Sequence, residues 1–234
     1  ETTLENINMI FKPGTKTALV GESGSGKSTI IKLILGLNSN YSGSIKYDNF
    51  NIDSIPTREM TKITTLITND SYLVKGTVRE HLSVRKNITE EEMYNALEKV
   101  NLRDFVEEHG GLDYELAIGA SNLSGGQKQR LLAAKAILKD SYLYILDEAV
   151  SNIDDYSKEI VLNAFDSIKE GKIIIVISHD LETVTNADNI YVLKDKKIIE
   201  EGTHDELIEE NSLYRRLFTD QQQLKSKFLA KEVE

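Results

Sequence analysis

The sequence predicts an α/β fold, and three observations support this prediction. Helical and strand-like stretches alternate along the 234 residues. Residues 142–146 and 172–177 are nearly all apolar, as parallel strands covered on both faces are. A glycine-rich phosphate-binding motif, residues 21–28, lies between a short strand and an apolar helix. We therefore expect a P-loop NTPase (RecA-like) core with a mixed sheet, split by an inserted α-helical subdomain.

The expected elements follow from apolar periodicity and turn residues. Short runs between Gly, Asn and Asp predict strands at 4–11, 17–20, 44–47 and 64–67, and an apolar helix at 27–37. Residues 76–139 have a helical pattern; Thr89 is the expected N-cap of a helix over 90–100. Strand patterns return at 142–146, 172–177, 190–193 and 197–199, and the polar stretch after Leu217 suggests a terminal helix or a frayed tail.

Length and composition limit the function classes. We expect one domain, with residues 1–70 and 140–220 forming the nucleotide-binding core, 71–139 the helical subdomain and 221–234 a C-terminal tail. The net charge of −10 disfavours a general nucleic-acid binder. The longest aliphatic run, 173–177, is too short to span a bilayer. Because the chain starts at Glu1 without methionine, we expect it to be part of a longer polypeptide.

Residues 21–28 read GESGSGKS, which fits the motif G-x-x-x-x-G-K-[ST]. Its glycines let backbone N–H groups approach phosphate oxygens, and the following helix adds its positive end. Lys27 can reach the β- and γ-phosphates of a nucleotide, and the Ser28 hydroxyl can ligate Mg²⁺. The predicted nucleotide-binding residues are Gly21, Glu22, Ser23, Gly24, Ser25, Gly26, Lys27, Ser28 and Thr29.

Two carboxylates follow the apolar run 142–146. Ligands bind at the carboxyl ends of strands in open α/β sheets, so Asp147 is placed to hold Mg²⁺ through water. Glu148 is placed to polarise a water molecule that attacks the γ-phosphorus. Two solvated acids in a loop are the alternative, but the phosphate-binding motif upstream favours the functional interpretation.

Two further features lie at element ends. Leu123, Ser124, Gly125, Gly126 and Gln127 read LSGGQ and open a helix over 127–139, which predicts a second anion site at its N-terminus. A capped core helix is the alternative. His179 follows the apolar run 172–177 and can donate a hydrogen bond to a γ-phosphate; a structural histidine is equally compatible with its position.

These motifs, in this order, resemble those of the nucleotide-binding domain of ATP-binding cassette (ABC) transporters, over nearly the whole chain. The resemblance makes 21–28 the Walker A motif, 123–127 the signature, 142–147 Walker B and Glu148 the catalytic base. It also makes His179 the switch histidine and Ser151 to Asp154 the D-loop. Residues 76–80 and 201–207 look like those of the exporter type.

The resemblance implies a mechanism. Two cassettes would face head to tail, with each ATP between the P-loop of one and the LSGGQ of the other. Closure and Mg²⁺-dependent hydrolysis would drive a transmembrane domain, at the cytoplasmic face of the membrane. No nucleic acid is expected as a partner.

The chain departs from the family pattern at one metal-ligand position. Asn69 stands where a glutamine is usual and would still contribute to the Mg²⁺ site with Ser28 and Asp147. The family's adenine-stacking aromatic would lie before Glu1. Two other functions remain open: a weakly hydrolysing regulatory cassette of a heteromeric transporter, and a soluble ABC ATPase with no role in transport.

Overall fold

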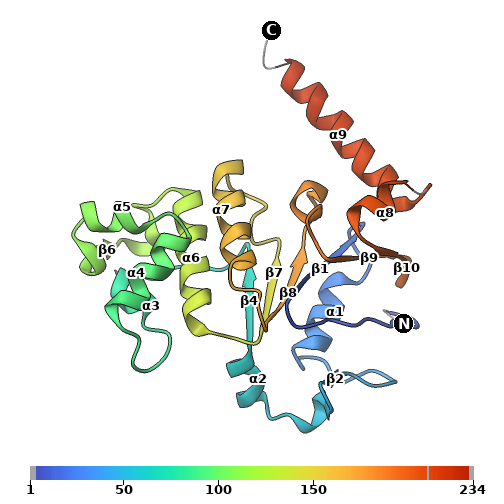
Figure 1. Ribbon diagram of the computed structural model, residues 1–234, viewed down its shortest axis with the longest axis horizontal. Coiled ribbons are helices and arrows are strands. Elements are labelled where there is room, and N and C mark those ends of the chain that lie inside the picture. The colour runs from blue at the N-terminus through green and yellow to red at the C-terminus, as the bar shows by residue number, and fades with distance from the viewer. Residues whose placement is uncertain (1–3, 210, 232–234) are drawn as a thin grey trace. The chain divides into compact units, whose positions relative to one another are not determined.

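The computed structural model of the protein describes residues 4–209 and 211–231. Its central feature is a six-stranded mixed sheet, which confirms the predicted α/β class (Figure 1). From one edge to the other, the strands are β10 (Lys197–Gly202), β9 (Asn189–Lys194), β1 (Thr15–Gly21), β8 (Ile173–Ile177), β7 (Leu143–Asp147) and β4 (Thr64–Thr68).

The strand directions and burial explain the apolar runs in the sequence. Strands β1 and β9 are parallel, β4 and β7 are parallel, and β10 runs antiparallel to β9. All five residues of β8 and the first four of β7 are buried. Both strands were predicted as covered on two faces, because neither alternates polar with apolar residues.

Helices and two small hairpins connect these strands. The hairpins pair β2 (Lys46–Tyr47) with β3 (Phe50–Asn51), and β5 (Gly76–Thr77) with β6 (Glu115–Leu116). The helices are α1 (Lys27–Ile34), α2 (Thr57–Ile63), α3 (Val78–Leu82), α4 (Glu90–Lys99), α5 (Arg103–Glu108), α6 (Gly125–Lys139), α7 (Asp155–Asp166), α8 (His204–Glu209) and α9 (Leu213–Lys231). Short 3-10 helices span Ile52–Ser54, Gly111–Asp113, Ile118–Ala120 and Leu181–Val184.

The chain divides into two compact units. One contains the residues up to 61 together with those from 175 onward, and the other contains residues 62–174. In the first unit lie the phosphate-binding motif and His179. The second holds Asp147, Glu148 and the LSGGQ segment.

Several predicted elements differ in the structure. The segment 76–139, predicted to be helical, also contains the β5–β6 hairpin, and only Lys46–Tyr47 of the strand predicted at 44–47 is formed. Residues 4–11 do not form a strand, although their apolar pattern predicted one. The amide of Glu5 donates to the carbonyl of Lys196, and that of Ile10 donates to the Tyr191 hydroxyl. These isolated bonds do not make a ladder, and a strand requires continuous pairing with a neighbour. The helix predicted over 27–37 ends at Ile34, because the chain turns at Gly36, whose φ is 67°.

The polar stretch after Leu217 is helical up to Lys231, which was one of the two predicted alternatives, and its last three residues lie outside the described part of the chain. Helix α9 has 19 residues and follows α8 (Figure 1). Within residues 4–209 and 211–231, no helix combines the length and the apolar character that a bilayer span requires.

Helices α6 and α7 pack together through a point where only glycine fits. A Cβ atom added to Gly126, in the first turn of α6, would lie 2.2 Å from Ser157 Oγ and 2.6 Å from Asp154 Oδ2. Ser157 is buried in α7 and cannot easily retreat. At the neighbouring Gly125, an added Cβ would meet nothing within 4 Å.

We therefore expect Gly126→Ala to lower the free energy of unfolding by about 1–3 kcal/mol, as overpacking does. Gly125→Ala, one residue away in the same turn, should leave it unchanged or raise it slightly, because alanine is the better helix former. Urea denaturation of both variants measures the difference. Equal stability of the two would contradict the packing argument.

Candidate nucleotide-binding site

The phosphate loop begins at a position that only glycine can occupy. Gly21 ends β1, pairs with Leu193 of β9 and has a φ of 147°. A Cβ atom there would lie 2.2 Å from the carbonyl oxygen of Leu193. Gly26, with a φ of 110°, then leads the chain into α1. The loop therefore depends on glycine at both of its ends.

The N-terminus of α1, like that of α5, lacks the side-chain cap found at α3, α4, α6 and α7. The side chains of Thr77, Thr89, Ser124 and Asp154 accept hydrogen bonds from backbone N–H groups at the starts of α3, α4, α6 and α7. Gly26 offers no such group to α1. The hydroxyl of Ser25 is buried and has no hydrogen-bond partner among the described residues. A helix start without a side-chain cap, with an unpartnered buried hydroxyl beside it, fits a phosphate group.

Lys27 supplies a positive charge at the same loop. Its side chain is buried, and its Nζ donates to the carbonyl oxygens of Gly21 at 2.7 Å and Glu22 at 3.0 Å. The ammonium group is thus held against the loop backbone. Ser28, the next residue, is exposed in the first turn of α1, so its hydroxyl is accessible to a cation beside the phosphates.

In the second unit, three of the predicted site residues, Asn69, Asp147 and Glu148, lie at the carboxyl ends of the paired strands β4 and β7. Thr68 is the partner of Asp147, so Asn69 and Glu148 each follow a paired strand end. Asn69 is exposed, and Asp147 and Glu148 are half-buried. Carboxylate and amide oxygens are ligands that suit Mg²⁺.

Glu148 has an unusual backbone conformation. Its φ is 54°, in the left-handed region that non-glycine residues seldom adopt. Both the amide and the hydroxyl of Ser151 donate to the Glu148 carbonyl oxygen, at 3.1 and 2.9 Å. Such a conformation costs on the order of 1–3 kcal/mol and is found preferentially at functional sites.

Within residues 4–209 and 211–231, no group of three or more His, Cys, Asp or Glu side chains could hold a metal ion. Mg²⁺ in phosphate sites commonly takes one or two protein oxygens and leaves the rest to phosphate and water. The oxygen groups of Asn69 and Asp147 in the second unit, and that of Ser28 in the first, are each of the kind that such a cation takes.

The LSGGQ segment forms a reciprocal cap at the start of α6. The Ser124 hydroxyl accepts from the amide of Gln127 at 3.1 Å, and Gln127 Oε1 accepts from the amide of Ser124 at 2.8 Å. A hydroxyl that accepts one bond can still donate its own proton. Leu123 and Gly126 are buried, whereas Ser124 and Gly125 are exposed. One side of this helix start is therefore open to solvent.

The D-loop residues support the same helix start. Asp154 caps α7 by accepting from the amide of Ser157 at 2.8 Å. That hydrogen bond, helped by the Ser157 hydroxyl, lowers the pKa of the Asp154 carboxyl, which therefore stays ionised at neutral pH. Side-chain atoms of Asp154 and Ser157 are also the nearest neighbours of an added Cβ at Gly126, so the start of α7 packs directly against the start of α6.

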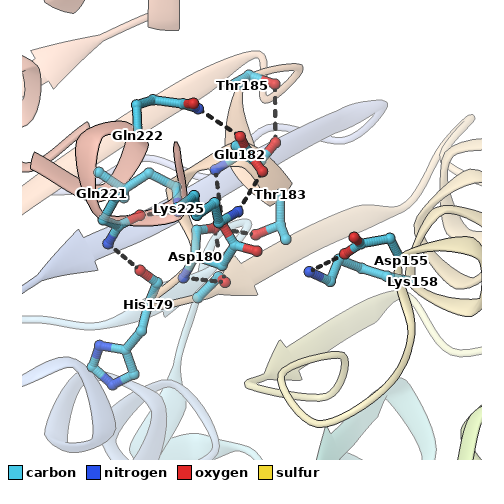
Figure 2. Close-up of polar contacts among 12 residues, drawn as sticks. Asp155, Lys158, His179, Asp180, Glu182, Thr183, Thr185, Gln221, Gln222 and Lys225 are labelled. Atoms are coloured by element: carbon cyan, nitrogen blue, oxygen red, sulfur yellow. Dashed lines mark hydrogen bonds and ion pairs between the residues drawn. The ribbon is translucent and has the colours of Figure 1, made fainter. Parts of the chain in front are cut away.

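His179 is exposed and directly follows Ser178, the first residue after β8. The next residues are held by local bonds: Ser178 Oγ accepts from the amide of Asp180 at 3.0 Å, and Thr183 Oγ1 donates to the Asp180 carbonyl at 2.6 Å. Gln221 of α9 also contacts this segment (Figure 2). Sequence reasoning missed Gln221, because the contact joins residues 42 positions apart and has no local pattern.

Comparison with known proteins identifies the family. Residues 4–151 match the family model described as ABC transporter. An uncharacterized ABC transporter ATP-binding protein of Haemophilus influenzae is 42% identical over 222 residues, covering 94% of this chain and 40% of that protein. An ATP-dependent lipid A-core flippase of Neisseria meningitidis serogroup B is 37% identical over 216 residues, covering 92% of this chain and 35% of that protein.

A solved structure is also similar. The structure of a bacterial Atm1-family ABC exporter with ATP bound matches with a TM-score of 0.85 and 27% identity, over 94% of this chain and 39% of that chain. The chain thus spans about two fifths, or slightly less, of the length of these relatives. On the family match over residues 4–151 and these relatives, the chain is an ATP-binding domain of the ABC transporter family.

Proposed function

We propose that the chain is the ATP-hydrolysing motor domain of an ABC exporter. The observation that carries this proposal is the uncapped start of α1, with Lys27 held against the loop and the buried Ser25 hydroxyl beside it. Strained Glu148 at the end of a buried strand supports hydrolysis in addition to binding. The exporter relatives, one named an ATP-dependent flippase, support a role in export.

Each proposed residue has a defined task. The N–H groups of 21–29 and the Lys27 ammonium bind the β- and γ-phosphates of ATP. Ser28, Asp147 and Asn69 would hold Mg²⁺, which neutralises charge on those phosphates. Glu148 orients a water molecule and accepts its proton, and His179 donates a hydrogen bond to the γ-phosphate.

The second anion site requires a partner. One P-loop already supplies a full phosphate cradle, so the exposed Ser124 and Gly125 are proposed to bind the ATP of a second cassette. In this arrangement the D-loop, through Ser151 and Asp154, connects the signature with the catalytic Glu148. Because the relatives are longer than this chain, we propose that a transmembrane domain of the same transporter tethers it to the cytoplasmic face of a membrane.

A regulatory cassette that binds ATP but hardly hydrolyses it is the second candidate. Asn69 favours it, because asparagine is one methylene shorter than the usual glutamine. The side chain is exposed, so lengthening it meets no packing barrier. A basal ATPase assay of the chain separates the two functions.

Glu148→Gln should keep ATP binding and lower turnover by ~10²-fold or more, the usual scale for removal of a general base. Phosphate release under saturating ATP measures the effect. Glu159→Gln, an exposed change on α7, is the matched control and should turn over at the parental rate. Parental turnover in Glu148→Gln would contradict the role of this carboxylate.

Asn69→Gln should raise the ATPase rate or leave it unchanged, because the longer side chain brings the amide closer to the metal and the attacking water. Steady-state assays over a range of Mg²⁺ concentrations check this expectation. A fall of about tenfold or more would show that the segment after β4 is shaped around asparagine and that the assigned role is wrong.

ATP-dependent dimerisation is the expected behaviour of the Glu148→Gln variant. Without ATP, two chains that each carry a net charge of −10 repel one another and stay monomeric. With saturating ATP, shared γ-phosphates add charge-assisted hydrogen bonds at two symmetric sites. Light scattering should then report twice the mass of one chain.

Gly125→Asp in the same background should abolish the dimer and leave ATP binding by the P-loop nearly intact. The substitution puts a carboxylate where an anion must bind, at a position where an added Cβ meets nothing within 4 Å of its own chain. A monomeric Glu148→Gln variant, or a dimer that tolerates Gly125→Asp, would show that the chain does not form the proposed ATP sandwich.

A further inference from the structure

Two side chains on one face of the C-terminal helix α9 contact the segment that carries His179. Gln221 and Lys225 are four residues apart and lie on the same face of α9. Both contact residues 179–182, which form the end of the connection after β8 and the start of the 3-10 helix Leu181–Val184 (Figure 2). Gln222 adds a hydrogen bond to Glu182 at 2.5 Å.

Gln221 makes the most specific of these contacts. Its Nε2 donates to the carbonyl oxygen of His179 at 2.6 Å, and its Oε1 accepts from the amide of Leu181 at 3.0 Å. A carbonyl can only accept and an N–H can only donate, so this pair fixes the orientation of the amide. One side chain thereby fixes the backbone at two positions, directly at His179 and two residues beyond it.

The ion pairs nearby contribute less. Lys225 Nζ lies 3.0 Å from Asp180 Oδ1 and also contacts Glu182. The Lys225 side chain is 42% exposed, and exposed pairs are screened by solvent. The hydrogen bond from Lys225 lowers the pKa of the Glu182 carboxyl, so the pair persists at neutral pH. These charges attract α9 to the loop, whereas the Gln221 amide determines the position of the backbone.

The imidazole of His179 extends away from Gln221, so the contact is to the backbone and leaves the ring accessible (Figure 2). A hydrogen bond to a γ-phosphate requires the ring within a few tenths of an ångström of its place. We propose that Gln221 is a positioning residue for His179 and that the docking of α9 thereby sets the rate of ATP turnover. This inference rests on the proposed role of His179.

Gln221→Leu tests the proposal, because leucine keeps much of the side-chain volume and removes both hydrogen bonds. Gln223→Leu is the matched control: Gln223 lies two residues further along α9, is exposed, and its side chain makes no hydrogen bond within residues 4–209 and 211–231. Both variants should have the same melting temperature within a few degrees, since each change is outside the core.

The first measurement does not depend on ATP. Amide hydrogen exchange of Leu181, followed by NMR, should accelerate by roughly 3- to 10-fold in Gln221→Leu, as loss of one ordinary hydrogen bond predicts. It should stay at the parental rate in Gln223→Leu. Unchanged exchange at Leu181 in Gln221→Leu overturns the proposal, because the loop would then be held without the amide.

The second measurement is ATP hydrolysis. Gln221→Leu should lower kcat by about 10-fold and leave KM for ATP within about twofold, because the P-loop contacts are untouched. In a His179→Ala background, the same substitution should cause no further loss. A residue that acts only on general stability would lower activity by the same factor in both backgrounds.

The outcomes separate this proposal from the proposed function. Parental turnover in His179→Ala overturns the assigned role of His179, and the positioning inference with it. Parental turnover in Gln221→Leu alone overturns the positioning inference and leaves the role of His179 intact. An equal loss in Gln223→Leu would show that the effect comes from α9 in general, and not from the amide contact.

Discussion

The uncapped start of α1 is the constraint on which the proposed chemistry depends. The first N–H groups of any helix lack partners within the helix, and a side-chain cap normally satisfies one of them. The chain uses such caps at α3, α4, α6 and α7. At α1 a glycine with a φ of 110° takes the cap position, so no side chain satisfies a donor there and the helix start is open to an anion. The helix start is thus completed when an anion binds.

The two helix starts that the proposed function requires are built differently. Gly26 leaves α1 uncapped, whereas Ser124 and Gln127 cap α6 reciprocally. At the start of α6, the two consecutive glycines Gly125 and Gly126 have different surroundings. Gly126 faces Asp154 and Ser157 inside the chain, and Gly125 faces open space. Packing within this chain explains the glycine at position 126. The glycine at position 125 has a physical meaning only if a ligand or a partner approaches it closely.

Local sequence patterns predicted the features of the fold that depend on neighbouring residues. The N-cap at Thr89, the buried runs of β7 and β8, and the glycine loop before Lys27 all depend on neighbouring residues. Residues 4–11 were predicted wrongly as a strand, because strand formation depends on a pairing partner and not on an apolar pattern alone. The positive φ of Glu148 and the contact of Gln221 with His179 depend on tertiary structure, which no local pattern encodes.

The loops that carry the proposed chemistry are held by a few hydrogen bonds, while the strands before them are fixed by burial. Ser151 holds the Glu148 carbonyl, Asp154 caps α7, and Gln221 holds the backbone on either side of Asp180. Each such bond contributes about 0.5–1.5 kcal/mol, far less than the burial of β7 and β8. Charge-assisted bonds to phosphate are stronger than these neutral ones. Binding of a nucleotide can therefore exchange the hydrogen bonds of a loop without disturbing the strand that precedes it.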